Sequence, residues 1–224
     1  MGSSRNRIVP TDYPGVFTDG EMLLTRNAVP RDRVYGERLY DQDEAEYREW
    51  VPTRSKLAAY IRKGGRTFPF EEGSRVLYLG AASGTTSSHI ADIVGSGTVY
   101  CVEISQRSFR DLVSVCERRK NMVPILADAT RPDDYAFAVE SPTVLYQDIA
   151  QKGQAAIFAK NLSAFNIRKG LLTIKARSED VTKDPPVIFK EIEAQLVKAG
   201  CKVDEMVDLE PFEKDHAMAA VSVR

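Results

Sequence analysis

The sequence predicts a doubly wound α/β fold, in which helices cover both faces of a mostly parallel sheet. From residue 75 onward, strand-like and helix-like segments alternate along the chain, as they do in such folds. The strand-like segments are continuous apolar runs, which are typical of strands buried on both faces. The first of them ends in a glycine-rich turn that leads into a helical pattern. Ligands of such sheets bind at the carboxyl ends of the strands.

Composition fits one globular α/β domain with a small appendage. The 224 residues are 43% apolar and 28% charged, which is ordinary for a soluble protein. No stretch approaches the roughly 18 apolar residues of a membrane span, and the start lacks the apolar core of a signal peptide. We therefore expect no membrane partner and a cytoplasmic location. Cys101, Cys116 and Cys201 form no CxxC pair, so we expect buried thiols in a reducing compartment and no metal site.

The first part of the chain is predicted to be separate. Residues 1–54 are expected to form a small β-rich domain, and residues 55–224 the α/β domain. Two short extended runs flank the turn signal Asp19-Gly20, so a hairpin is predicted there. The charged run at residues 43–49 is expected to be a solvated face.

The remaining elements follow from apolar runs and from their capping residues. Ser55 is expected to cap a helix over residues 56–63, which Gly64 and Gly65 end. Strands are expected at residues 76–79, 98–104, 123–127, 143–147, 170–175, 201–209 and 217–224. Helices are expected at residues 85–94, 105–119, 151–165 and 186–199. The last two strands are expected to form a hairpin that Pro211 interrupts.

The turn after the first strand, GAASG at residues 80–84, is a candidate ligand loop. Its small residues allow a sharp turn and bring a ligand close to backbone amides where the next helix starts. It matches neither the dinucleotide pattern GxGxxG nor the Walker pattern GxxxxGK[ST], which disfavours a nicotinamide dehydrogenase. A glycine-rich turn of this kind also occurs where elements simply pack tightly, so the loop alone does not identify a ligand.

Acidic residues at the ends of the next strands narrow the ligand. Glu103 lies about 20 residues after the loop, where an acid can accept both hydroxyls of an adenosine ribose; the alternative is a solvated strand end. Asp128 ends the third strand and can accept the adenine amine, and Asp148 follows the fourth. The pattern fits a nucleoside without a pyrophosphate. S-adenosylmethionine satisfies that description.

The chain resembles the fibrillarin family in these and several further motifs. The resemblance covers nearly the whole chain, from about Met22 to the C-terminus. Its motifs are YLGAASGTT at residues 78–86, VYCVE at 99–103, DA at 128–129, YQDIAQ at 146–151, KARS at 175–178, VYGE at 34–37 and RSKLAA at 54–59. The Gly/Arg-rich tail of eukaryotic fibrillarins is missing, so the chain resembles the short archaeal form.

The resemblance implies a class I, Rossmann-like S-adenosylmethionine-dependent methyltransferase. Its sheet would have seven mostly parallel strands and a C-terminal antiparallel hairpin, preceded by a small N-terminal β domain. The implied reaction is methyl transfer to ribose 2′-hydroxyls of rRNA and tRNA, directed by box C/D guide RNA. The implied partners are a Nop-type scaffold protein and a kink-turn-binding ribosomal-type protein. A net charge of −1 is low for a protein that grips RNA alone, and partners that hold the substrate would account for it.

The resemblance also implies site residues. The cofactor contacts would be Gly80, Thr85, Thr86, Glu103, Ile104, Asp128, Ala129, Asp148, Ile149, Ala150 and Gln151. The catalytic group would be Lys56, Asp148, Lys175 and His216. We expect Lys175 to activate the hydroxyl, Asp148 to orient Lys175, and Lys56 and His216 to position the substrate. A lysine beside another cation loses its proton more readily, and the remaining cation can stabilise a developing alkoxide.

Other interpretations stay open at this point. A methyltransferase that acts on a small molecule or a protein side chain would share the cofactor loop without needing a guide particle. A non-catalytic subunit would keep the fold and bind no cofactor. For residues outside the implied site we expect structural roles: Trp50 and Tyr60 should pack where the two domains meet, and His89 should be structural.

Overall fold

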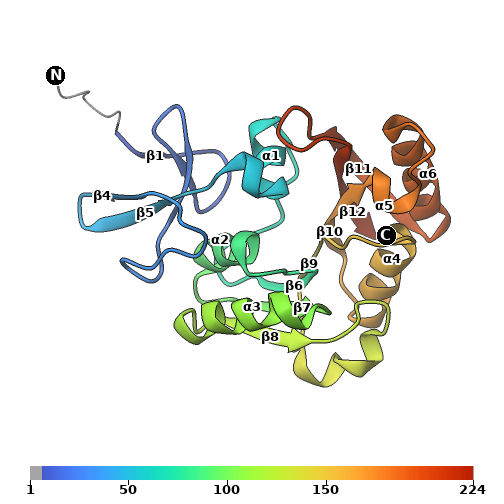
Figure 1. Ribbon diagram of the computed structural model, residues 1–224, viewed down its shortest axis with the longest axis horizontal. Helices are drawn as coiled ribbons and strands as arrows, with labels where there is room; N and C mark the ends of the chain where they lie inside the picture. The colour runs from blue at the N-terminus through green and yellow to red at the C-terminus, as the bar shows by residue number, and fades with distance from the viewer. Residues whose placement is uncertain (1–6, 224) are drawn as a thin grey trace.

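The computed structural model describes residues 7–223, which form two β-sheets and the helices around them (Figure 1). The first six residues of the predicted N-terminal domain lie outside the described residues. So does Arg224, the predicted end of the last strand. Within residues 7–223, no helix is long and apolar enough to cross a membrane.

The large sheet has seven strands in the order β11-β12-β10-β9-β6-β7-β8. Its strands are β6 (Arg75–Leu79), β7 (Thr98–Glu103), β8 (Met122–Leu126), β9 (Val144–Gln147), β10 (Lys169–Lys175), β11 (Cys201–Asp208) and β12 (His216–Val223). Strands β6 to β10 are parallel to one another, whereas β12 runs antiparallel to both β10 and β11. The predicted sheet, with its antiparallel C-terminal hairpin, is confirmed.

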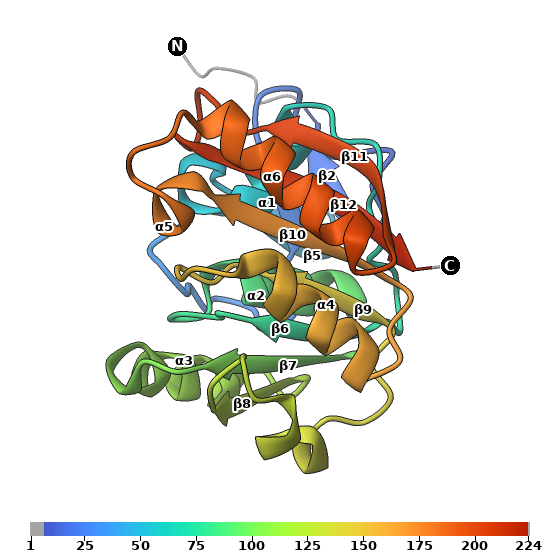
Figure 2. The ribbon, with the colours of Figure 1, turned by 90° about the vertical axis from the view of Figure 1, so that its right-hand side faces the viewer.

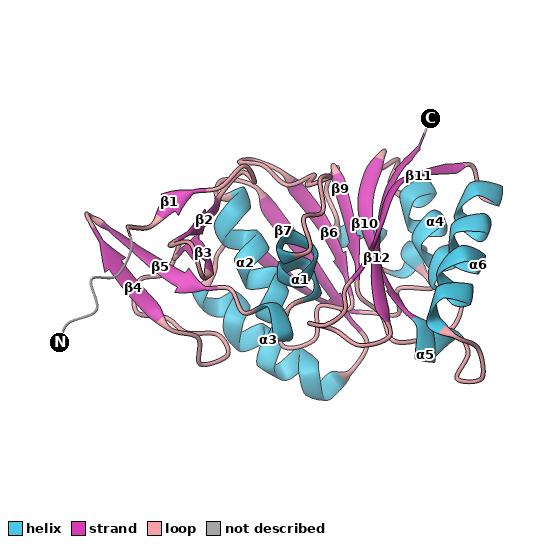
Figure 3. Cartoon of the chain, turned by 90° about the horizontal axis from the view of Figure 1, so that it is seen from above, coloured by secondary structure: helices cyan, strands magenta, loops and turns pink. Residues whose placement is uncertain are grey.

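Helices cover both faces of this sheet (Figure 3). They are α1 (Lys56–Arg62), α2 (Thr85–Val94), α3 (Gln106–Arg118), α4 (Gln154–Ala164), the short α5 (Ala176–Glu179) and α6 (Pro185–Lys198). One apolar core joins α1, α2 and α3 to one face, and a second joins α4 and α6 to the other. Because both faces are covered, the strands can be continuously apolar, as the sequence pattern indicated. Figure 2 shows α4 and α6 in front of the sheet.

Most predicted boundaries agree with the structure to within a residue or two. Ser55 caps α1 by accepting the backbone N–H of Ala58 at 3.4 Å, as predicted. The helix predicted from residue 151 starts later, at Gln154, because Gly153 precedes it in the left-handed region at φ 78°. Helix α5 was not predicted; it is a single turn of four residues, too short to show a helical period.

The small sheet has the strand order β1-β2-β3-β5-β4. Its strands are β1 (Val9–Pro10), β2 (Val16–Thr18), β3 (Leu23–Arg26), β4 (Leu39–Gln42) and β5 (Ala45–Glu49). The antiparallel pairing of β2 with β3 confirms the predicted hairpin. Strand β3 lies against α2, which brings the small sheet onto the same face of the large sheet as α1 to α3.

The prediction of a solvated face at residues 43–49 was wrong. Most of this run forms β5, in which Glu46 is 8% exposed and Arg48 is completely buried. Charged side chains can be buried when they are paired, and Arg48 donates to Glu37, Ser88 and Asp92. The partners lie far away in the sequence, so the run alone did not reveal them.

The contact between the small sheet and α2 buries the aromatic residues predicted to be structural. Trp50 stacks on His89 with 4.9 Å between the ring centroids, and both are completely buried. Thr25 and Tyr35 hydrogen-bond the two ring nitrogens of His89, at 2.7 and 2.9 Å. Tyr60 is also buried, and all three cysteines are buried and unpaired. The predicted burial is confirmed, and Trp50 packs at the junction as predicted, whereas the Tyr60 hydroxyl hydrogen-bonds Thr67 and Glu205 of β11.

Candidate active site at the carboxyl ends of the parallel strands

A cavity of about 270 Å³ opens at the carboxyl ends of β6, β7, β8 and β9. It lies beside the β6–β9 pair, where the strand order reverses and where doubly wound sheets bind their ligands. Its lining residues are Gly80, Ala82, Val102, Glu103, Ile104, Ser108, Ala127, Asp128, Ala129, Asp148, Ile149, Ala150, Gln151 and Lys175. The structure therefore brings together all the predicted cofactor residues except Thr85 and Thr86.

Gly80 lines the cavity directly after the end of β6. Its φ is +80°, and a Cβ at this position would lie 2.7 Å from the backbone oxygen of Asp148. A side chain at Gly80 would therefore be strained by its backbone and would also collide with the neighbouring strand end. The glycine keeps the ends of β6 and β9 close together.

Glu103 is held in place by backbone amides and is only 8% exposed. Its Oε2 accepts the N–H of Ala82 at 2.8 Å, and its Oε1 accepts the N–H of Ser105 at 2.7 Å. A carboxylate has about four acceptor positions, so Glu103 keeps capacity for a ligand while its own orientation is set. The alternative of a solvated strand-end glutamate does not fit this burial.

Thr85 and Thr86 begin α2 but lie outside the cavity lining. The Thr86 hydroxyl, at a residue only 6% exposed, donates to Ser55 Oγ at 2.9 Å. Ser55 is the N-cap of α1, and the next residue is Lys56. The side chain of Thr86 thus connects the ligand loop to the helix that carries a predicted catalytic lysine.

Three of the four predicted catalytic residues meet at one edge of the cavity. The Lys175 Nζ lies 2.8 Å from Asp148 Oδ1 and also donates to the backbone oxygen of Asp148 at 3.0 Å. The Lys56 Nζ lies 3.4 Å from Asp148 Oδ2. These side chains are 13–17% exposed, so they are largely screened from bulk water, and Asp148 and Lys175 line the cavity.

His216 lies beside this group, because it is paired with Lys175 in the register of β10 and β12. Burial lowers the pKa of His216, and the positive charges of Lys56 and Lys175 lower it further, while the backbone of Lys214 and the Asp148 charge oppose the shift. The ring is therefore favoured in its neutral form.

Glu213 is a neighbour of this group that the sequence did not indicate. Its Oε2 lies 3.8 Å from His216 Nδ1, and its side chain is 18% exposed. Burial raises the pKa of Glu213; Lys56 and Lys175 oppose the rise and Asp148 adds to it. The only signal in the sequence is an acid three residues before His216, which looks the same as a solvated loop residue.

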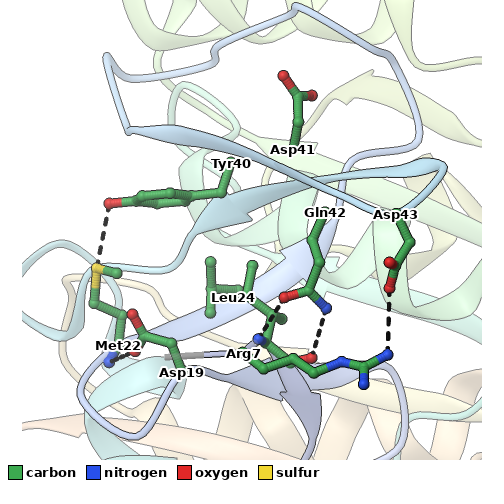
Figure 4. A pocket seen from close by; sticks show the side chains of 9 residues that line it. Arg7, Asp19, Met22, Leu24, Tyr40, Asp41, Gln42 and Asp43 are labelled. Atoms are coloured by element: carbon green, nitrogen blue, oxygen red, sulfur yellow. Dashed lines mark hydrogen bonds and ion pairs between the residues drawn. The ribbon is translucent and has the colours of Figure 1, made fainter. Parts of the chain in front are cut away.

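A second cavity, of about 360 Å³, lies in the small sheet (Figure 4). Its polar side chains largely bind one another or nearby backbone: Gln42 pairs with the backbone of Ile8, Tyr40 donates to Met22 Sδ, and Arg7 pairs with Asp43. It lies away from the strand ends and from the lysine–aspartate group. The cavity at the strand ends is therefore the candidate active site.

The fold and this site define the class of the protein. A seven-stranded sheet with an antiparallel terminal hairpin, combined with a nucleoside-sized cavity bordered by strand-end acids, is that of a class I S-adenosylmethionine-dependent methyltransferase.

Comparison with known proteins then identifies the family. The fibrillarin family model matches residues 8–224. The fibrillarin-like rRNA/tRNA 2′-O-methyltransferase of Methanopyrus kandleri is 54% identical over 209 residues, which cover 91% of this chain and 90% of that protein. The chain belongs to the fibrillarin family.

Two solved structures agree with this assignment. Aeropyrum pernix fibrillarin, crystallised with natively bound S-adenosyl-L-methionine, superposes with a TM-score of 0.87 at 44% identity, covering 96% of this chain and 99% of that one. A fibrillarin in complex with Nop5p superposes with a TM-score of 0.87 at 39% identity, covering 95% and 99%.

Proposed function

We propose that this protein is an S-adenosylmethionine-dependent RNA ribose 2′-O-methyltransferase, the catalytic subunit of a box C/D guide ribonucleoprotein. The observation that carries the proposal is the position of Asp148, which lines the cavity and also contacts both Lys56 and Lys175. A methyl donor in the cavity would thus lie beside groups that can handle a hydroxyl proton. The Methanopyrus kandleri relative, whose match covers 91% of this chain, is named a fibrillarin-like rRNA/tRNA 2′-O-methyltransferase.

The residues of the cavity fit S-adenosylmethionine. Glu103 would accept hydrogen bonds from the ribose hydroxyls, and Asp128 would accept one from the adenine amine. The loop that begins at Gly80 offers no phosphate-binding pattern, as suits a ligand without phosphates. Ile104 is 61% exposed at the cavity wall, where it gives an adenine ring an apolar surface. When bound, the cofactor supplies a methyl group on a cationic sulfur.

The lysine–aspartate group would prepare the nucleophile. A ribose hydroxyl is a poor nucleophile, so a neighbouring group must take or share its proton. We assign that role to Lys175, which Asp148 holds at the edge of the cavity, and the positioning of the substrate to Lys56 and His216. Alignment of the hydroxyl with the methyl group would contribute most to the rate, and Lys56 can stabilise the developing negative charge.

The particle would supply what this chain lacks for RNA binding. With a net charge of −1, the chain has little of the excess positive charge that binds phosphates. We propose a Nop-type scaffold as its partner, as in the fibrillarin–Nop5p complex, together with a kink-turn-binding protein and a box C/D guide RNA. We also propose that residues 1–54 and 55–224 are separate domains and that the particle is cytoplasmic.

Methyl transfer from labelled S-adenosylmethionine to an rRNA fragment tests the proposal. We expect incorporation at the guide-selected 2′-hydroxyl when scaffold, kink-turn protein and guide are present, and almost none on free RNA. Strong activity without scaffold or guide, on a small molecule or a protein, would favour a different methyltransferase. No binding of S-adenosylmethionine by calorimetry would leave only a non-catalytic subunit.

A further inference from the structure

Glu213, on the segment that joins β11 to β12, and His216, the first residue of β12, form a pair at the edge of the site. Both side chains are mostly buried, at 18% and 23% exposed, and Glu213 Oε2 lies 3.8 Å from His216 Nδ1. That Nδ1 atom is buried and has no aligned hydrogen-bond partner. A buried, unsatisfied ring nitrogen is costly; the Glu213 carboxylate and the backbone of Lys214 are the nearby groups that can satisfy it.

The two nitrogens of an imidazole point in different directions, and a bond to one decides what the other can do. When Nδ1 donates to a carboxylate, Nε2 carries no proton and can accept a hydrogen bond. Catalytic hydrogen bonds are often long without substrate and shorten when it binds. A hydrogen bond would need the two atoms, 3.8 Å apart in this structure, to approach by about 1 Å.

We propose that Glu213 is a positioning residue for His216. It holds the Nδ1–H of the ring, so that the unprotonated Nε2 faces the substrate and helps to orient the hydroxyl whose proton Lys175 takes. This inference rests on the proposed function, since the hydroxyl is that of a ribose. His216 would then have one defined neutral tautomer, and Glu213 would affect the reaction only through the histidine.

Several charges face the His216 ring, and each contributes to its titration. Lys56 from α1 and Lys175 from β10 disfavour the protonated ring, while Asp148 after β9 and the backbone of Lys214 favour it. Glu213, when ionised, is a further negative neighbour. Replacing it with an uncharged side chain of the same shape should therefore lower the pKa of His216.

The test compares wild type with Glu213→Gln by NMR titration and by kinetics in the assembled particle. The chain has only two histidines, so the signals of His216 can be assigned with the variant His216→Asn. We expect a neutral Nδ1–H tautomer in wild type and a lower His216 pKa in Glu213→Gln. We also expect kcat to fall about 10- to 100-fold, with an unchanged KM for S-adenosylmethionine and an acid limb shifted to lower pH.

Two further variants separate positioning from folding. Glu210→Gln changes an exposed acid of the same segment and should leave both kcat and the pH profile unchanged. In a His216→Asn background, Glu213→Gln should cause little additional loss, because a residue that acts through another has nothing left to position. Full additivity of the two losses would overturn the proposal.

The NMR titration tests the Glu213–His216 pair independently of methyl transfer. An unchanged tautomer and pKa in Glu213→Gln would also overturn the inference and would leave the Lys214 backbone as the group that holds the ring. If the wild-type particle transferred no methyl group while the NMR shift occurred, the proposed function would fail and the Glu213–His216 pair would remain.

Discussion

The molecule contains two clusters of paired charges that are built from similar residues and serve different ends. The junction cluster, between the small sheet and α2, consists of Arg48, Arg119, Asp92 and Glu37. The site cluster, at the cavity, consists of Lys56, Lys175 and Asp148. In the junction cluster the Arg48, Arg119, Asp92 and Glu37 side chains are completely buried. In the site cluster the side chains are 13–17% exposed.

The choice of cation explains much of this difference. Each arginine presents a rigid fork of donors that can satisfy several acceptors at once. Arg48 donates to Glu37, Asp92 and Ser88, and Arg119 donates to Asp92 and Asn27. A lysine is a point charge on a flexible stem, so it can leave one partner for another. The junction cluster is thus suited to holding elements together, and the site cluster to exchanging contacts with a substrate.

The largest expected effect comes from Lys175→Ala. Loss of the group that activates the hydroxyl should lower kcat by about 10²- to 10⁴-fold, while S-adenosylmethionine binding and thermal stability change little. Single-turnover methyl transfer and calorimetry measure the two quantities. Lys169→Ala is the matched control, because Lys169 is exposed at the start of the same strand. Near-normal turnover of Lys175→Ala would mean that the site cluster does not activate the hydroxyl.

For Arg48→Ala, in the junction cluster, we expect the main loss to be in stability. Removing one partner of a buried ion pair leaves the others uncompensated, which costs about 3–5 kcal/mol of unfolding free energy. Denaturant unfolding followed by the fluorescence of Trp50, the single tryptophan, measures this loss. Arg38→Ala removes an exposed pair with Glu49 and should cost no more than about 1 kcal/mol. Equal losses in the two variants would mean that the junction cluster stabilises the fold no more than the Arg38–Glu49 pair does.

The two clusters also differ in how far the sequence predicted them. Asp148 stands just past a strand end, where position along the chain already implies position in space, and the family resemblance supplied Lys56, Lys175 and His216. Arg48 lies in a polar run whose partner Asp92 is 44 residues away, and no local pattern distinguishes it from a solvated residue. Glu213 was missed for the same reason. Periodicity predicts the elements, but it does not predict which charges fold into contact.

A smaller effect is expected where the two regions meet, at the hydrogen bond from Thr86 to Ser55. Thr86→Val keeps the shape and removes the donor, whereas Thr86→Ser keeps the hydroxyl. We expect Thr86→Val to lose about 1 kcal/mol of stability and about tenfold in kcat, because Lys56 follows Ser55 on α1. Thr86→Ser should retain most of both. Equal kcat in the two variants would mean that the bond does not help to place Lys56.

The last expected effect is a pH dependence of stability that separates the two histidines. Burial, together with the charges of Arg48 and Arg119, lowers the pKa of His89 well below its ordinary value of 6.5. The unfolded chain therefore binds a proton below pH 6.5 that the folded chain does not. Unfolding free energy should be constant above that pH and fall as the pH drops below it, by at most about 1.4 kcal/mol per unit for each such histidine.

Between about pH 6 and 5 most carboxylates are still ionised in both states, so this slope belongs mainly to His89 and His216, whose pKa is also lowered. His89→Gln should lower stability at every pH, because contacts to Thr25 and Tyr35 change, and should reduce the slope. His216→Gln should reduce the slope by a smaller amount, because His216 is only partly buried. Denaturant titrations at several pH values measure both slopes. An unchanged slope in His89→Gln would mean that His89 can be protonated in the folded protein. The burial of the junction cluster would then not distinguish it from the site cluster.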